Sequence, residues 1–191
     1  MLLGERGEIK GVGSLFGARP AEQAAAASAG RVKDQHGIGL PGNDVHQLLG
    51  RSSSRDLIVA GHQQTTQEWW ENRRMEFECS VSQVVIDEAS VGDPAEVQKR
   101  LAIIGGLPAL EVTETAESLT RAIMAAGILP PHAFPDAAHV AVSAVHAVDY
   151  LLTWNCKHLA NAQIARRIAV VCEKLGHRMP IICTPEELMG A

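Results

Sequence analysis

The sequence lacks the long apolar run that a membrane-spanning helix requires, since none of its apolar stretches approaches about 20 residues. Its first residues, MLLGERGEIKGVGS, also lack a basic start followed by a sustained apolar core, so we expect no signal peptide. Both absences predict a cytoplasmic protein with no membrane partner.

Paired cysteine motifs and a positive charge excess are missing as well. The four cysteines contain no CxxC pair and, together with the nearby histidines, match no common zinc spacing, which favours buried free thiols (Cys79, Cys156, Cys172 and Cys183). The formal net charge is −5, so a nucleic acid would need a local basic patch or a metal ion. No glycine-rich phosphate loop follows a strand, because Gly105–Gly106 lacks the spacing, which weakens the case for an unrelated α/β enzyme with a small-molecule ligand.

The composition changes near residue 55. Residues 1–55 hold 10 of the 17 glycines and carry seven basic against five acidic residues, whereas the rest of the chain carries 10 basic and 17 acidic residues. Few apolar positions in residues 1–53 follow a helical or a strand period, so we interpret this segment as irregular. We expect residues 54–191 to form one domain of ordinary size with its own core.

Strands and helices alternate through the second part of the chain. We expect strands at 77–82, 109–113, 150–154 and 180–184, and helices at 57–74, 83–91, 93–105, 114–127, 135–148, 161–176 and 185–189. This alternation predicts an α/β fold with a mostly parallel sheet and helices on both faces. In such folds the ligand site lies beyond the carboxyl ends of the strands.

Polar groups gather at two of those strand ends. Thr153 and Asn155 share one side of the strand that ends near residue 154, and Asp87 and Glu88 lie in the short helix after strand 77–82. The helix between them places Asp136, His139, Ser143 and His146 within a narrow arc. Oxygen-rich sites of this kind suit Mg²⁺ or Mn²⁺.

Each of these residues has a simpler interpretation. Asp136 follows a proline and would support the first turn of any helix, and Glu88 could be one more solvated acid. His139 and His146, seven residues apart, could form a surface stripe. Asn155 after a strand is often a turn residue.

The joint arrangement is more specific than its parts. The phrases VSQVVIDEA and PDAAHVAVSAVHAVDYLLTWNCKHLANA resemble the PIN-domain family, in particular VapC-like toxins of type II toxin–antitoxin systems. The resemblance covers the chain from about residue 54 to its end. Its most specific part is the helix that opens with Asp136, followed by a strand that ends in the T-x-N-x-x-H-L phrase. It implies a three-layer α/β/α sandwich, a metal-dependent ribonuclease activity with Mg²⁺ or Mn²⁺, a cognate antitoxin and a homodimer.

The resemblance also assigns roles to residues. Glu88 and Asp136 match the family's acids, and Asn155 stands where many members have an acid; these three would be the catalytic and metal-binding residues. His139, Ser143 and Thr153 would lie behind the metal ligands or face the substrate. The residues expected to contact RNA phosphates are Lys157, Arg166 and Arg167. An equally good interpretation is that these three belong to an ordinary solvated helix start and helix face.

The family's first, central strand and its acid have no clear counterpart. This strand should precede the helix that opens at Asp56. In that part of the sequence, however, Pro41–Gly42 and Asn43–Asp44 are typical of turns. If suitable synonymous codons for residues 40–50 are translated in the reading frame that starts one nucleotide later, they give a strand-like phrase with a glutamate. Our hypothesis is that residues 1–53 are translated out of frame, with a genuine N-terminal extension as the alternative. The chain would then be a degraded copy, and a catalytically inactive nucleic-acid-binding or regulatory PIN-like module is the alternative function.

Overall fold

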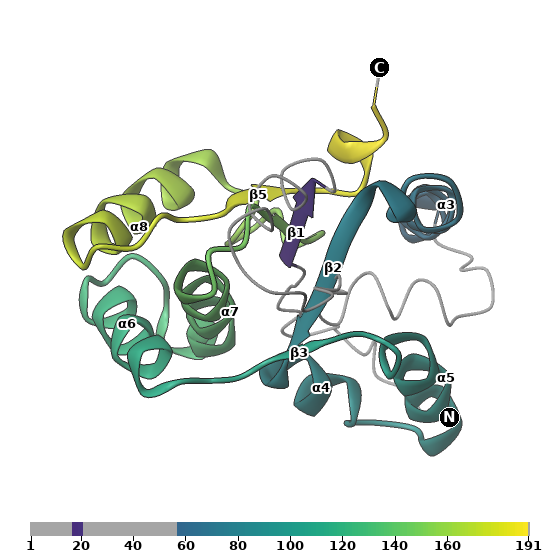
Figure 1. The fold of residues 1–191 in the computed structure, drawn as a ribbon, viewed down its shortest axis with the longest axis horizontal. Coiled ribbons are helices and arrows are strands. Elements are labelled where there is room, and N and C mark those ends of the chain that lie inside the picture. Colours follow the sequence, from purple (N-terminus) through teal and green to yellow (C-terminus); the bar gives the residue numbers. More distant parts are fainter. Residues whose placement is uncertain (1–16, 21–56, 191) are drawn as a thin grey trace, which may run out of the picture.

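The structure, a computed structural model, describes residues 17–20 and 57–190 (Figure 1). Asp56 and the phrase at 40–50 lie outside the described residues, so the predictions made for them stay predictions. The described residues contain six α-helices, which are α3 (Leu57–Asn72), α4 (Gln83–Ala89), α5 (Pro94–Ile104), α6 (Glu114–Ala125), α7 (Phe134–Val145) and α8 (Ala162–Lys174). Short 3-10 turns are η1 (Arg74–Glu76), η2 (Pro131–Ala133) and η3 (Glu186–Leu188).

Five strands form one sheet in the order β3-β2-β1-β4-β5. They are β1 (Gly17–Pro20), β2 (Phe77–Ser82), β3 (Ala109–Leu110), β4 (Tyr150–Leu152) and β5 (Ile181–Cys183). The pairs β2–β3 and β4–β5 are parallel, and β1 runs antiparallel to both β2 and β4. Strands β2 to β5 therefore all point the same way, as the alternation predicts, and their carboxyl ends lie at one edge of the sheet.

The central strand differs from the prediction. Gly17–Pro20 belongs to the segment that we expect to be irregular, yet its backbone pairs from Gly17↔Ser80 to Pro20↔Phe77 on one side and at Ala18↔Tyr150 on the other. With β1 in place, β2 and β4 have a neighbour on both sides and present no open edge there. The sheet is thus mostly parallel with one central antiparallel strand.

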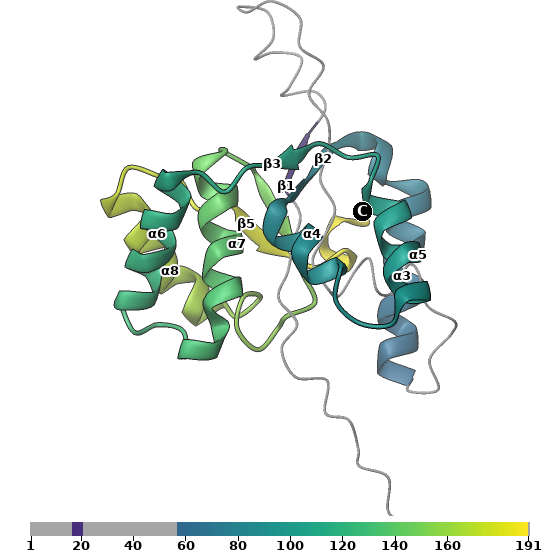
Figure 2. The ribbon, with the colours of Figure 1, turned by 90° about the horizontal axis from the view of Figure 1, so that it is seen from below.

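Helices lie on both sides of the sheet. In Figures 1 and 2, α6, α7 and α8 lie on one side and α3 and α5 on the other. The mixed α/β class is confirmed, and the three-layer sandwich of the PIN type stays a prediction. None of the helices within 57–190 has the length and apolar character that crossing a membrane needs.

Helix ends follow the signals in the sequence. Asp93 caps α5, since its Oδ1 accepts hydrogen bonds from the backbone N–H groups of Ala95 at 3.0 Å and Glu96 at 3.2 Å, and Pro94 occupies the first turn. Gly127 follows α6 with a φ of +61°, a conformation that favours glycine. The helices were predictable because such signals are local. The strand predicted at 109–113 is shorter, and the helix predicted at 185–189 is a 3-10 turn.

The hydrophobic core surrounds β4 and α7. Leu151 and Leu152 of β4 are fully buried, and so is Ile168 of α8. Every residue of α7 from Asp136 to Ala144 is buried as well. Polar groups on α7 therefore lie inside the protein and need internal partners.

The cysteines divide into two classes. All four lie in the described part of the chain as free thiols; Cys79, Cys172 and Cys183 are buried, as expected, but Cys156 is exposed, contrary to the expectation. Burial raises the pKa of Cys172 to about 11 and that of Cys183 to about 12. Cys156 lies in the turn after β4, which the core does not cover.

This division predicts the order of thiol modification. At neutral pH we expect iodoacetamide to modify Cys156 first and the three buried thiols far more slowly, because the thiolate is the nucleophile and burial disfavours it. Mass spectrometry of the intact and the digested protein measures this order, and urea-unfolded protein, in which all four thiols should react, is the control. Modification of Cys172 or Cys183 before Cys156 in the folded protein would contradict the packing described above.

Candidate functional site

Asp136 lies in the first turn of α7 and is 4% exposed. Its Oδ1 accepts a hydrogen bond from Asn155 Nδ2 at 3.1 Å, and its Oδ2 lies 2.9 Å from His158 Nδ1. The residue at the N-cap of α7 is Ala133, which makes no capping bond through its side chain. Asp136 is therefore directed away from its own helix and towards the loop after β4, and the simple capping interpretation does not describe it.

Asn155 organises that loop. Its backbone N–H donates to Thr153 Oγ1 at 2.8 Å, and its Oδ1 accepts from the backbone N–H of His158 at 3.1 Å. Its carbonyl oxygen accepts from the N–H of Leu159 at 3.0 Å. Asn155 is thus a turn residue, as the simpler interpretation has it, and it also fixes the orientation of the Asp136 carboxylate.

Glu88 approaches α7 from a different part of the chain. It lies in α4, which begins directly after β2 with Ser82 as its N-cap. Glu88 Oε2 lies 3.3 Å from His139 Nε2, but the two atoms are not aligned as a hydrogen bond. The His139 side chain is fully buried, whereas that of Glu88 is 18% exposed. His139 is therefore not part of a surface stripe.

Both acids lie close enough to His139 to interact with it. His139 follows Asp136 by one helical turn on α7, and it is close enough to act on the Asp136 charge. Burial raises the pKa of Asp136, while the hydrogen bond to His158 and the nearby His139 oppose this rise. The sequence prediction that Glu88 and Asp136 meet at the sheet edge is consistent with this geometry.

The raised pKa predicts how stability depends on pH. The folded protein binds the Asp136 proton more tightly than the unfolded chain, so this group's contribution to the free energy of unfolding falls as the pH rises from below 3.8 through the raised pKa. Asp136→Asn should therefore gain stability relative to the wild-type protein across this interval. Urea unfolding of both proteins in the acidic range measures the difference, and a constant difference would show that Asp136 keeps its ordinary pKa.

The chemistry of the donors fits a divalent cation in part. Glu88, Asp136 and Asn155 supply oxygen atoms, and one buried oxygen, Glu88 Oε2, has no hydrogen-bond partner among the described residues. Both Asp136 oxygens, in contrast, already bond to Asn155 and His158. Within residues 17–20 and 57–190, no three or more His, Cys, Asp or Glu side chains form a ready-made metal cage. A cation here would keep several water ligands.

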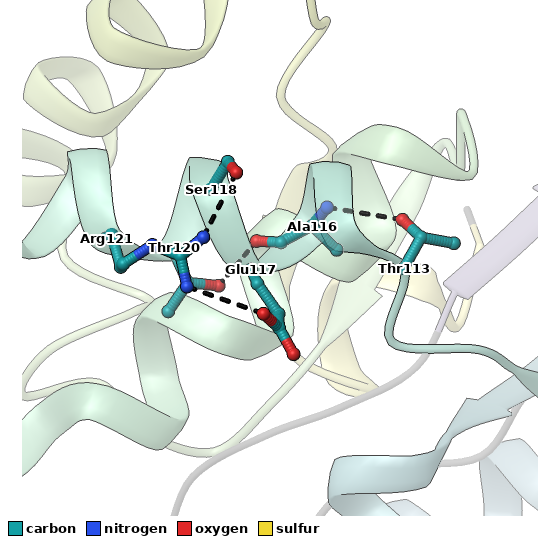
Figure 3. A network of polar contacts seen from close by, with 6 residues as sticks. All are labelled: Thr113, Ala116, Glu117, Ser118, Thr120 and Arg121. Atoms are coloured by element: carbon teal, nitrogen blue, oxygen red, sulfur yellow. Dashed lines mark hydrogen bonds and ion pairs between the residues drawn. The ribbon is translucent and has the colours of Figure 1, made fainter.

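An apolar cleft of about 450 Å³ opens beside Glu88. Val84 and Glu88 of α4 line it, together with Phe134 at the start of α7, whose side chain is largely exposed. Its other wall is α6, where Figure 3 shows Arg121 reaching Glu117 at 3.4 Å and Ser118 at 3.2 Å. The cleft gives solvent and ligands access to the Glu88 side of the site.

The remaining predicted residues lie at different depths. Ser143 is buried on α7, and Thr153 is buried beside Asn155. Lys157 is exposed in the loop after β4, and Arg166 and Arg167 are exposed on α8. The first two side chains are therefore shielded from solvent, whereas the three basic side chains lie at the surface.

Sequence reasoning left His158 out of the site. Its ring bonds to Asp136 and lies 5.7 Å, between ring centroids, from that of the exposed His132. The signal was the N-x-x-H spacing after the strand, because a three-residue step in a tight turn returns the side chain towards Asn155.

The chain matches no family model, no curated protein and no solved structure.

Proposed function

We propose that this chain is a metal-dependent endoribonuclease of the VapC-like PIN type, which hydrolyses RNA phosphodiester bonds and is neutralised by a cognate antitoxin. The observation that carries the proposal is the approach of Glu88 and Asp136, from separate elements, to His139. Since β2 and β4 run parallel, α4 and the Asn155 loop start at the same edge of the sheet. A buried and a partly buried acid at that edge fit what cation-assisted phosphate chemistry requires.

The chain's own residues would divide the work. Glu88 and Asp136 hold the cation directly or through water, and Asn155 and His158 keep the Asp136 carboxylate in one orientation. Once bound, Mg²⁺ or Mn²⁺ would lower the pKa of a bound water and offset the charge that builds on the phosphate. Lys157, Arg166 and Arg167 would contact the RNA backbone. The PIN-type sandwich and a homodimer belong to the same proposal.

A second function has specific support. Both Asp136 oxygens are occupied by neighbours, and the sequence of the central strand, Gly17–Pro20, contains no acid. These two observations favour a nucleic-acid-binding or regulatory module that keeps the fold without catalysis. The two functions differ in whether bound RNA is cut.

One experiment separates them. Purified protein is incubated with labelled RNA in Mn²⁺ or in EDTA, and cleavage and binding are measured together. We expect cleavage with Mn²⁺, none with EDTA, and none in Asp136→Ala, whose fold is checked by circular dichroism. RNA binding without cleavage would support the module instead, and cleavage that survives both EDTA and Asp136→Ala would refute the proposed site.

A further inference from the structure

His139 is an unusual buried histidine. It is fully buried, and neither of its ring nitrogens has a hydrogen-bond partner among the described residues. Leaving such a buried polar atom unpaired costs about 1–3 kcal/mol, so proteins seldom do it without a reason. Glu88 Oε2, also buried and without a hydrogen-bond partner in the described chain, lies 3.3 Å from His139 Nε2.

The distance between these atoms has a chemical meaning. Divalent transition-metal ions bind imidazole nitrogen and carboxylate oxygen at about 2.0–2.2 Å. Two such ligands on one ion lie about 3.0 Å apart at a right angle and about 3.4 Å apart at the tetrahedral angle. The observed 3.3 Å falls in this range, and the two atoms lie this close without forming a hydrogen bond to each other.

We propose that His139 Nε2 and Glu88 Oε2 are direct ligands of one first-row transition-metal ion, with water completing its coordination. Asp136, whose oxygens bond to Asn155 and His158, acts on this ion through water. The inference concerns the cation of the proposed nuclease and rests on that proposal for its functional meaning. It changes the expected role of His139 from a residue behind the ligands to a ligand.

A nitrogen ligand changes which cation is preferred. Mg²⁺ binds oxygen ligands at near-ideal octahedral geometry, whereas transition-metal ions accept imidazole readily. The site should therefore prefer Mn²⁺ over Mg²⁺. The ion would enter from the cleft, because Glu88 lines the cleft and is 3.3 Å from the fully buried His139.

The test uses Mn²⁺ alone as the probe. Loss of the free Mn²⁺ signal in electron paramagnetic resonance measures binding to the full chain, and pulsed measurements detect ¹⁴N coupling from a coordinated imidazole. We expect ¹⁴N coupling in the wild-type protein, and Mg²⁺ in about tenfold excess should displace less than half of the Mn²⁺. His139→Gln should lose the coupling and bind Mn²⁺ at least about tenfold more weakly.

The matched control is His146→Gln. His146 caps the end of the same helix, and its Nε2 lies 2.9 Å from the carbonyl oxygen of Glu111, outside the site. This variant should keep both the affinity and the ¹⁴N coupling. Tightly bound Mn²⁺ without ¹⁴N coupling in the wild-type protein would overturn the inference, even if His139→Gln failed to fold, and so would no Mn²⁺ binding.

The outcome is separable from that of the proposed function. Mn²⁺ binding with ¹⁴N coupling but no RNA cleavage would support this metal site and refute the nuclease. RNA cleavage with a cation bound through oxygen alone would support the nuclease and refute this metal site.

Discussion

Glu88→Gln is expected to lower metal-dependent RNA cleavage by at least about 100-fold, because it removes one of the two negative charges that would hold the cation in place. The substitution keeps the size of the side chain and one oxygen, so packing around α4 should change little. Single-turnover cleavage of a labelled RNA in Mn²⁺ measures the effect, and circular dichroism reports whether the fold is kept.

Asp87→Asn is the matched control for this variant. Asp87 is the neighbouring acid on the same helix, but it is exposed and accepts a hydrogen bond from Gln83 Nε2 at 2.8 Å. We expect its cleavage rate to stay within about twofold of wild type, since an exposed charge is largely screened. Equal losses in the two variants would mean that overall charge, and not the position of Glu88, supports the reaction.

Leu151→Ala should lower the free energy of unfolding by about 2–5 kcal/mol. Leu151 is fully buried in β4, which lies between β1 and β5, so its truncation leaves a cavity in the core. A loss of this size is a large share of the ~5–15 kcal/mol that stabilises a typical domain. Urea denaturation followed by tryptophan fluorescence measures it.

Leu175→Ala provides the comparison for this prediction. Leu175, at the end of α8, is 51% exposed, so the same truncation there should change the free energy of unfolding by no more than about 0.5 kcal/mol. If both variants lost the same stability, the core would not be centred on β4.

The sequence predicted those parts of the fold that depend on local signals. Asp93 and Pro94 mark the start of α5, and the alternation in FECSVS marks β2, because caps and periodicity act within a few residues. The approach of Glu88 to α7 was also foreseeable, since the carboxyl ends of parallel strands share one edge.

Other features depend on contacts that no local pattern carries. Gly17–Pro20 belongs to the segment that we expect to be irregular, yet its place in the sheet depends on partners some 60 to 130 positions away in the chain. The role of His158 depends on the turn that Asn155 builds. The exposure of Cys156 follows from the same turn, which lies beyond the end of β4.

Strand β1 is four residues long, and within the sheet it alone connects the β2–β3 pair to the β4–β5 pair. Glu88 follows one pair, and Asn155, which orients the Asp136 carboxylate, follows the other. The proposed cation site is therefore built from two halves of the sheet that β1 joins. A substitution in Gly17–Pro20 should therefore change the distance between the two halves, and with it the spacing of the proposed metal ligands, without altering any residue that is proposed to hold the cation.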